Sequence, residues 1–158
     1  MTKIIHGKSN GRGKKIAVIA SEFNEFITKR LLDGCLDELT RLSVKKSDIT
    51  VAWVPGAYDI PVVAARFAKK RDVHAVICLG AVIRGETIHF ELVAQGAAQG
   101  ILQVSLTTGK PVIFGVLAVD TVDQAYKRSE EKGDNKGKDA AIAAIEMADV
   151  LKQAGGKK

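Results

Sequence analysis

Four short apolar runs, each followed by a segment with helical character, constrain the fold of this 158-residue chain more than any other feature. The expected strands are residues 15–20, 49–54, 75–79 and 111–119. The first intervening segment spaces apolar side chains by three or four residues, at Ile27, Leu31, Cys35, Leu39 and Leu42. Such spacing predicts a helix with one buried face. Continuous apolar strands that alternate with helices are typical of a parallel sheet covered on both faces.

The first expected helix ends near Ser43, the second begins around Ile60, and the others span about 89–108, 122–132 and 139–153. Because crossovers between parallel strands are right-handed, the pattern predicts a doubly wound, three-layer α/β sandwich. By analogy with flavodoxin-like sheets, we expect four parallel strands in the order 2-1-3-4.

The polar ends are expected to lie outside the single domain, which we place at residues 15–154. Residues 155–158 form a basic tail. Residues 1–14 contain one apolar pair, Ile4-Ile5, and could be a disordered tail or an arm that adds a strand to a neighbour's sheet.

The formal net charge is +6, and much of the positive excess lies near the two ends. A basic chain can bind nucleic acid, steer small phosphorylated substrates or simply keep its ends solvated. Aromatic residues are only 5% of the chain and no helix is arginine-rich, so nucleic acid ranks last of these three.

Cys35 and Cys78 both fall in apolar patterns, which predicts buried thiols and fits a reducing compartment. There is no C-x-x-C motif or histidine cluster, so neither a metal site nor a metal cofactor is expected. The sequence also lacks a bilayer-length apolar stretch and a signal-like start, so we expect a cytoplasmic protein that does not insert in membranes.

Residues 79–90 combine a strand end, a glycine-bearing turn and a helix start, which are the parts of an anion site. Gly85 would let the backbone approach a phosphate, and Thr87 offers a hydroxyl. His89 is a candidate proton-transfer group. The same residues also fit a helix cap at Thr87 with an incidental histidine, and the stretch by itself does not choose between the two.

In open α/β sheets, ligands bind outside the carboxyl ends of the strands. Three loops should therefore meet there: Phe23-Asn24, Gly56 to Asp59, and the 79–90 stretch. Together they would suit a planar heterocycle with a polyol arm and a separate phosphate. Each residue also has an ordinary role open to it, with Phe23 or Tyr58 packing and Asp59 capping a helix.

Two phosphate-binding motifs can be set aside. Gly7-Lys8-Ser9 ends like a P-loop, but it lacks the upstream glycine and no strand precedes it. Gly11-Arg12-Gly13 precedes the first strand, so it does not fit a dinucleotide fingerprint.

The chain resembles the 6,7-dimethyl-8-ribityllumazine synthase family, the penultimate enzymes of riboflavin biosynthesis. The run V-I-R-G-x-T-x-H-F at residues 82–90 carries most of the resemblance. Further matching pieces occur in family order at Phe23-Asn24, 53–61, 111–117 and 135–137. The resemblance covers nearly the whole chain, from about Ile4 to Leu151.

The resemblance implies a cofactor-free condensation of 5-amino-6-(D-ribitylamino)uracil with 3,4-dihydroxy-2-butanone 4-phosphate. An imine forms, phosphate leaves and the ring closes. By position, His89 would transfer protons, and the phosphate would be held by Gly85, Glu86 and Thr87. The other substrate would lie on Phe23, Ala57, Tyr58, Asp59, Ala81, Val82 and Ile83. A neighbouring subunit would supply Phe114, Lys136 and Arg128, with Arg128 on the phosphate.

Five positions depart from the family pattern. Asp59 stands where glutamate is common, Tyr58 replaces a usual phenylalanine, and Ala118-Val119 replaces two threonines. Glu86 often is a small residue in relatives, so we expect only its backbone N–H to face the phosphate.

The resemblance further implies pentamers, twelve of which form an icosahedral capsid in some members, and riboflavin synthase is a candidate partner. The turn from Ser129 to Gly137 lacks the insertion often found in members that stop at pentamers, so we expect the capsid. Two other hypotheses remain open. One is a non-catalytic shell protein that binds lumazine or flavin, and the other is a nucleic-acid-binding domain that uses the basic ends.

Overall fold

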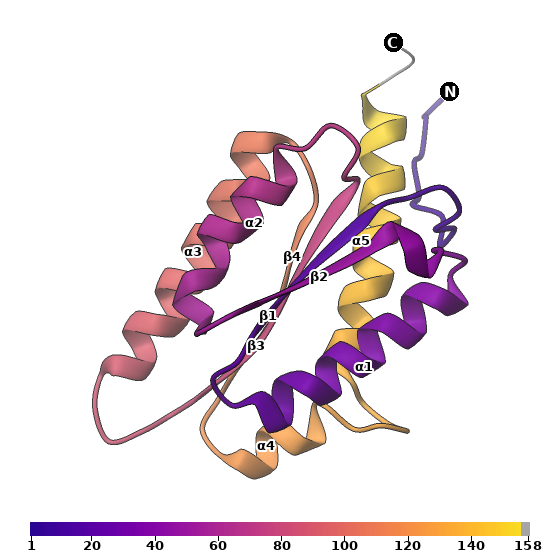
Figure 1. The fold of residues 1–158 in the computed structure, drawn as a ribbon. Coiled ribbons are helices and arrows are strands. Elements are labelled where there is room, and N and C mark those ends of the chain that lie inside the picture. Colours follow the sequence, from indigo (N-terminus) through magenta and orange to yellow (C-terminus); the bar gives the residue numbers. More distant parts are fainter. Residues whose placement is uncertain (156–158) are drawn as a thin grey trace.

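The computed structural model describes residues 1–155, in which four parallel strands form one sheet between two helical layers (Figure 1). The strands are β1 (Ile16–Ser21), β2 (Ile49–Val54), β3 (Ala75–Ile83) and β4 (Val112–Val119). Their order is β2-β1-β3-β4. The predicted fold class and strand order are therefore confirmed.

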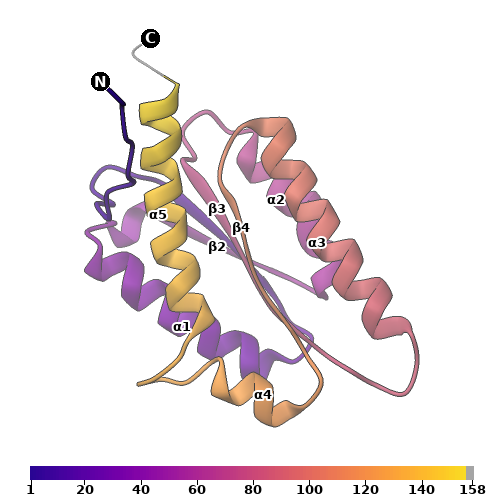
Figure 2. The same cartoon turned by 180° about the vertical axis from the view of Figure 1, so that it is seen from behind.

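Two helices cover each face of the sheet (Figures 1 and 2). Helices α2 (Ile60–Ala68) and α3 (His89–Thr108) lie on one face. Helices α1 (Glu25–Arg41) and α5 (Lys136–Ala154) lie on the other. The short helix α4 (Val122–Lys127) follows β4, and the 3-10 turns η1 (Lys46–Asp48) and η2 (Ala57–Asp59) flank β2.

The two central strands explain why two cores form. Strand β1 is buried along its whole length, and its side chains alternate between the faces. Ile16 and Val18 join the core under α1 and α5, while Ala17 and Ile19 join the core under α2 and α3. A strand buried on both faces needs a continuous apolar run, which is what the sequence supplies.

The predicted cysteine environments are also observed. The side chains of Cys35 and Cys78 have no exposed surface. Burial raises the pKa of the Cys35 thiol to about 12 and raises the pKa of Cys78 as well. Both therefore behave as small apolar core residues.

The boundaries of the last two helices differ from the prediction. Helix α4 ends at Lys127 instead of Lys132, and α5 begins at Lys136 instead of Asp139. The buried Asn135 side chain causes the earlier start, because its Oδ1 accepts from the Gly137 and Lys138 N–H groups at 2.9 and 3.1 Å. Lys136 is consequently the first residue of a helix and does not lie in a loop.

Residues 1–10 lie beside the C-terminal half of α5 (Figures 1 and 2). The Lys8 N–H donates to Asp149 at 2.9 Å, the Ser9 hydroxyl donates to Glu146 at 2.6 Å, and Gln153 donates to the His6 carbonyl at 2.8 Å. The arm forms no strand in the described part of this chain, and its pairing with a neighbour's sheet stays a prediction. Of the predicted basic tail, residues 156–158 lie outside the described residues.

Within residues 1–155, none of the helices combines the length and apolarity that crossing a bilayer requires. The same residues contain no group of three or more His, Cys, Asp or Glu side chains placed to hold a metal ion.

Candidate active site

The loops after β1, β2 and β3 meet at the carboxyl edge of the sheet, as the sequence predicts. The Glu22 and Phe23 N–H groups donate to the carbonyls of Val54 and Pro55 at 2.8 and 3.0 Å. On the other side, the Asn24 side chain donates to the Ala81 carbonyl at 2.8 Å. The β1 loop is thus fixed between its two neighbours because β1 lies between β2 and β3.

The loop after β1 presents an aromatic ring to solvent. Phe23 is 73% exposed, so it does not cap the core of its own chain. The next residue, Asn24, has a left-handed backbone with φ of 61° and begins α1. Asparagine tolerates this conformation better than most residues, which explains how the turn brings Phe23 outward.

The loop after β2 forms η2, in which Ala57 is buried and Tyr58 and Asp59 are exposed. An Asp59 oxygen accepts from the Gly56 N–H at 3.0 Å, so the carboxylate closes the 3-10 turn. It makes no side-chain cap to α2 itself. The Tyr58 ring lies against Gly96 of α3, where an added Cβ would come within 2.5 Å of the ring. The loop is therefore held by the Gly56–Asp59 hydrogen bond across the turn and by the Tyr58 ring on α3.

Strand β3 delivers the third loop. Ala81 and Val82 are buried near its end, and Arg84 donates its backbone N–H to the Val119 carbonyl at 2.9 Å. Gly85 through His89 are then exposed, and His89 is the first residue of α3. The His89 N–H donates to Thr87 Oγ1 at 3.3 Å, at the long end of the hydrogen-bond range. The N-cap residue of α3 is Ile88, which makes no side-chain cap, so the cap interpretation rests only on this long contact and the phosphate hypothesis stays open.

The surroundings of Gly85 also bear on whether this loop is a helix cap or a phosphate site. Its φ lies outside the left-handed region, and an added Cβ would meet nothing within 4 Å. The packing of the chain therefore does not require glycine at this position. Helix α3 begins four residues further on, and backbone N–H groups without helical partners at its N-terminus favour an anion.

Three predicted residues lie apart from these loops. Phe114 is 46% exposed on β4, so its ring does not belong to the core of this chain although it lies within a strand. Arg128 follows α4 and donates to the Gln124 carbonyl at 3.1 Å. Lys136 pairs with Asp139 at 3.3 Å and Asp134 at 3.4 Å, and the Asp139 contact is the main reason that its pKa is raised. Helix α4 lies at the same end of the sheet as the loops after β1 and β3 (Figure 1).

Asn135 holds the segment that carries Arg128 and Lys136. Its Nδ2 donates to the carbonyls of Arg30 and Glu130 at 3.2 and 3.1 Å, and the Lys136 N–H donates to the Arg128 carbonyl at 2.9 Å. Sequence reasoning gave Asn135 no role, although it lies in one of the matching pieces. It also missed Arg84, whose side chain contacts Asp120 and Glu91.

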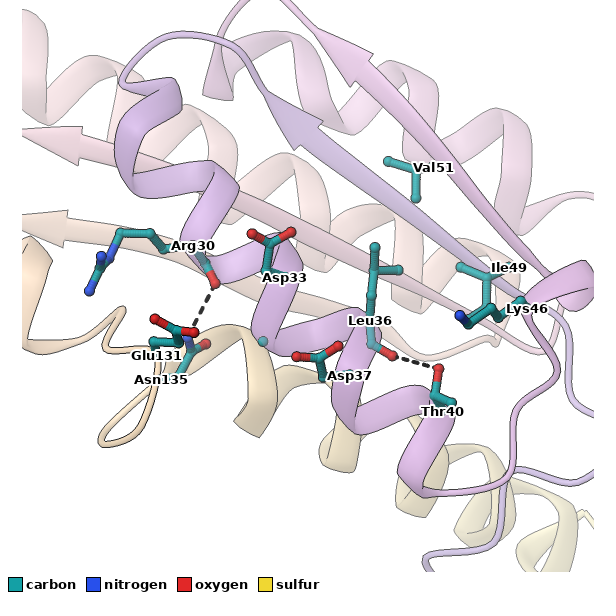
Figure 3. A pocket seen from close by; sticks show the side chains of 11 residues that line it. Arg30, Asp33, Leu36, Asp37, Thr40, Lys46, Ile49, Val51, Glu131 and Asn135 are labelled. Atoms are coloured by element: carbon teal, nitrogen blue, oxygen red, sulfur yellow. Dashed lines mark hydrogen bonds between the residues drawn. The ribbon is translucent and has the colours of Figure 1, made fainter.

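A hollow lies elsewhere, between α1 and the edge strand β2 (Figure 3). Its volume is about 750 Å³, and none of the predicted site residues lines it. The hollow exists because β2 is an edge strand, whose residues Ile49 and Val51 are only partly buried. Acidic side chains, from Asp33, Asp37 and Glu131, share the lining. The candidate site, by contrast, lies at the exposed carboxyl edge of the sheet.

Comparison with known proteins decides the family. The family model for 6,7-dimethyl-8-ribityllumazine synthase matches residues 13–152. The chain belongs to this family. A curated 6,7-dimethyl-8-ribityllumazine synthase from Desulfotalea psychrophila (strain LSv54 / DSM 12343) is 52% identical over 151 residues, which cover 96% of this chain and 97% of the relative. The resemblance drawn from the motifs is confirmed, while the individual residue roles stay predictions.

Gly85→Ala should separate ligand binding from folding. Because the added methyl meets open space at an ordinary φ, the free energy of unfolding in urea should stay the same or rise by up to about 1 kcal/mol. Binding of inorganic phosphate, measured by calorimetry, should weaken because the methyl enters the anion site.

Gly115→Ala is the matched control, since its Cβ would lie 2.7 Å from the Leu79 side chain and 2.8 Å from the Cys78 carbonyl. This variant should lose about 1–3 kcal/mol of stability through overpacking. An equal loss of stability in Gly85→Ala would contradict the ligand role of Gly85.

Proposed function

We propose that this chain condenses 5-amino-6-(D-ribitylamino)uracil with 3,4-dihydroxy-2-butanone 4-phosphate to give 6,7-dimethyl-8-ribityllumazine, phosphate and water. The observation that carries the proposal is the 52% identity, along almost the whole of both chains, to a relative named for this product. The occurrence of Phe23, Asp59 and His89 in the segments that follow β1, β2 and β3, at one edge of the sheet, supports it.

Each loop has a part of the substrates to bind. The exposed Phe23 ring stacks on the pyrimidine, and the Ala57 to Asp59 turn faces the ring and ribityl chain. The backbone of Ala81 to Ile83 contacts the ring edge. The loop of Gly85, Glu86 and Thr87 holds the phosphate at the positive end of α3. Holding two substrates in one orientation accounts for the larger share of the rate enhancement.

His89 transfers the protons of the reaction. The amine of the pyrimidine attacks the ketone, and water leaves as the imine forms. A proton is then removed from the carbon next to the imine as the phosphate departs, which leaves an enol that tautomerises to a ketone. The ribitylamino nitrogen attacks this ketone, and a second water leaves as the ring closes. His89 begins α3 two residues after Thr87, so it directly follows the proposed phosphate loop. A group in this position serves as general acid and base.

Asp59 supports the ribityl contact despite being shorter than glutamate. The Gly56 N–H at 3.0 Å fixes one carboxylate oxygen, and the side chain is exposed at the loop surface. A carboxylate held in this way can accept hydrogen bonds from the ribityl hydroxyls.

A neighbouring copy completes the site with Phe114, Arg128 and Lys136. Within one chain, these three side chains are exposed and belong to β4, α4 and α5 instead of the three converging loops. Arginine provides bidentate recognition of phosphate, which suits Arg128 for that substrate.

Helix α3 offers the surface for the pentamer. Its exposed apolar side chains are Ile88, just before the helix, and Leu92, Leu102 and Leu106. With Gln95 and Gln99, which are also exposed, they repeat every four and three residues, the spacing of a helix-packing seam. Two glycines of α3 face residues of the same chain, with Gly96 under Tyr58 and Gly100 against Pro61.

The edge strand β2 offers a second contact, with the arm of a neighbouring copy. An unpaired edge accepts a further strand. The hollow beside β2 is lined by three acidic side chains, from Asp33, Asp37 and Glu131, and by two basic ones, from Arg30 and Lys46, a small acidic excess that suits the basic arm residues Lys3 and Lys8. The turn at 128–135 is short and is closed by the Ser129–Asn135 bridge, which supports the icosahedral assembly of pentamers. Riboflavin synthase, which consumes the lumazine, is the proposed protein partner.

Incubation with both substrates should release phosphate and produce the fluorescence of the lumazine. His89→Ala should lower kcat by about 10²–10⁴-fold, the usual contribution of a general acid or base. Its native mass should equal that of the unchanged protein. Binding of product analogues without any turnover at high protein concentration would instead support a non-catalytic shell, for which the Asp59 and Ala118-Val119 departures are the grounds.

Mixed assemblies test whether each site spans two copies. Arg128→Ala alone should mainly raise the KM for the phosphate substrate. If His89→Ala and Arg128→Ala chains are unfolded and refolded together, some sites will contain both native residues. The mixture should then exceed the summed activity of the separately refolded variants. Equal activities would show that both residues serve the same chain's site.

Native mass spectrometry and light scattering test the assembly. The unchanged protein should form sixty-chain particles, as twelve pentamers require, whereas Leu106→Glu should dissociate the pentamer because a charge enters the α3 seam. Leu151→Glu is a matched control, since this 38% exposed leucine lies on α5. Free pentamers in the unchanged protein would contradict the capsid.

A further inference from the structure

Arg84 is held on three sides at the point where the proposed phosphate loop begins. Its Nε donates to Asp120 Oδ1 at 2.8 Å, and Nη1 donates to Glu91 Oε1. Its guanidinium carbon lies 4.5 Å from the centre of the Phe90 ring. Both carboxylates lie outside β3, one just after β4 and the other in the first turn of α3. We call these contacts of Arg84 with Asp120, Glu91 and Phe90 the Arg84 clamp.

The clamp fixes both ends of the exposed segment 85–88. At its start, the Arg84 N–H is bonded to the Val119 carbonyl at 2.9 Å. At its end, Phe90 and Glu91 contact the Arg84 side chain. A loop tied to itself across its own span has fewer conformations to lose when it binds a ligand.

The same pair resolves a conflict of charge. A carboxylate in the first turn of α3, at Glu91, stabilises the empty helix but opposes an anion bound at that terminus. Arg84 forms an ion pair with that carboxylate. The hydrogen bond from Arg84 is the main reason that the pKa of Glu91 is lowered, and the bond to Asp120 is the main reason that the pKa of Arg84 is raised. Both groups are thus held ionised as a pair.

The Arg84 clamp also connects to the segment that carries Arg128. The Asp120 N–H donates to the Gln124 side chain at 2.7 Å, and the Gln124 carbonyl accepts from Arg128 at 3.1 Å. The polar contacts thus run from the phosphate loop through the end of β4 to α4.

We propose that Arg84 is a positioning residue that orders the phosphate loop and neutralises Glu91, so that a phosphate can bind at the N-terminus of α3. The inference rests on the proposed function. Its consequence is specific: loss of Arg84 acts on the phosphate substrate and leaves binding of the pyrimidine substrate unchanged.

Steady-state kinetics on the assembled enzyme test this proposal. Arg84→Gln should raise the KM for the phosphate substrate roughly tenfold, since an unpaired Glu91 now faces the anion. The KM for the pyrimidine substrate should not change, and kcat should change far less than the KM for the phosphate substrate. Arg84→Lys should give an intermediate KM, because an ammonium cannot bridge two carboxylates as the guanidinium fork does.

The double variant Arg84→Gln/Glu91→Gln provides the decisive comparison. If Glu91 repels the phosphate when unpaired, removing its charge should lower the KM for the phosphate substrate most of the way back to that of the unchanged protein. Two outcomes would overturn the proposal in favour of a general structural role. One is a double variant whose KM for the phosphate substrate is as high as that of Arg84→Gln. The other is an Arg84→Gln variant in which kcat falls and both KM values rise together.

Lys15→Gln is the matched control, because it breaks an exposed pair with Asp72 at the opposite edge of the sheet. Equal kinetics for Arg84→Gln and this control would overturn the proposal. If Arg84→Gln fails to assemble, Asp120→Asn replaces it and should raise the same KM to a smaller extent; an unchanged KM would again overturn it.

Binding of inorganic phosphate, measured by calorimetry, distinguishes a failure of the proposed role of Arg84 from a failure of the proposed function. If the unchanged protein binds phosphate and Arg84→Gln binds it more weakly, the role of Arg84 is supported. If the unchanged protein binds phosphate and Arg84→Gln binds it equally well, only the role of Arg84 is lost. If the unchanged protein neither binds phosphate nor forms the lumazine, the proposed function itself is wrong.

Discussion

The pairing of β1 with β3 is the contact on which the candidate site depends. These central strands align in parallel, with Ile16 opposite Ala75 and Ala20 opposite Leu79. A shift of one residue would turn every β1 side chain to the other face and exchange the two cores. It would also move Ala81 by about 3.3 Å relative to Asn24 and break the 2.8 Å bond that joins their loops. Packing of the core therefore sets the geometry of the site.

The general frame of the fold was predictable because its determinants are local. Apolar runs and helical spacing predicted the strands and their helices, and the carboxyl-end rule placed the loops that carry Phe23, Asp59 and His89 at one edge of the sheet. The predictions fail where a contact between residues far apart in sequence determines the structure. Asn135 starts α5 early through bonds that include the Arg30 carbonyl, 105 residues away. The Arg84 clamp needs Asp120, 36 residues away, so no spacing rule could have indicated it.

The solvent exposure of large apolar side chains was the property that the sequence predicted least well. It is also the strongest indication of surfaces used in assembly. Phe114 has a strand-core pattern in sequence, yet 46% of its surface is exposed because β4 is an edge strand. Leu106 is 75% exposed and Phe23 is 73% exposed. Large exposed apolar side chains on a folded chain indicate surfaces that another molecule covers. The proposed site and the proposed assembly surfaces share this property, so turnover should depend on assembly.

Gly85 and Arg84 show how binding and stability divide between neighbouring residues. Arg84 is fixed by an aromatic ring, two carboxylates and a backbone bond, whereas Gly85 borders open space. Rigid support directly beside an unfilled position is what a preorganised anion site requires, because the loop then loses little freedom when the ligand arrives. In sequence, Gly85 cannot be told from a glycine that the fold needs. A methyl group added at Gly85 would have no atom within 4 Å, so packing within the chain does not require this glycine, which agrees with its proposed role in ligand binding.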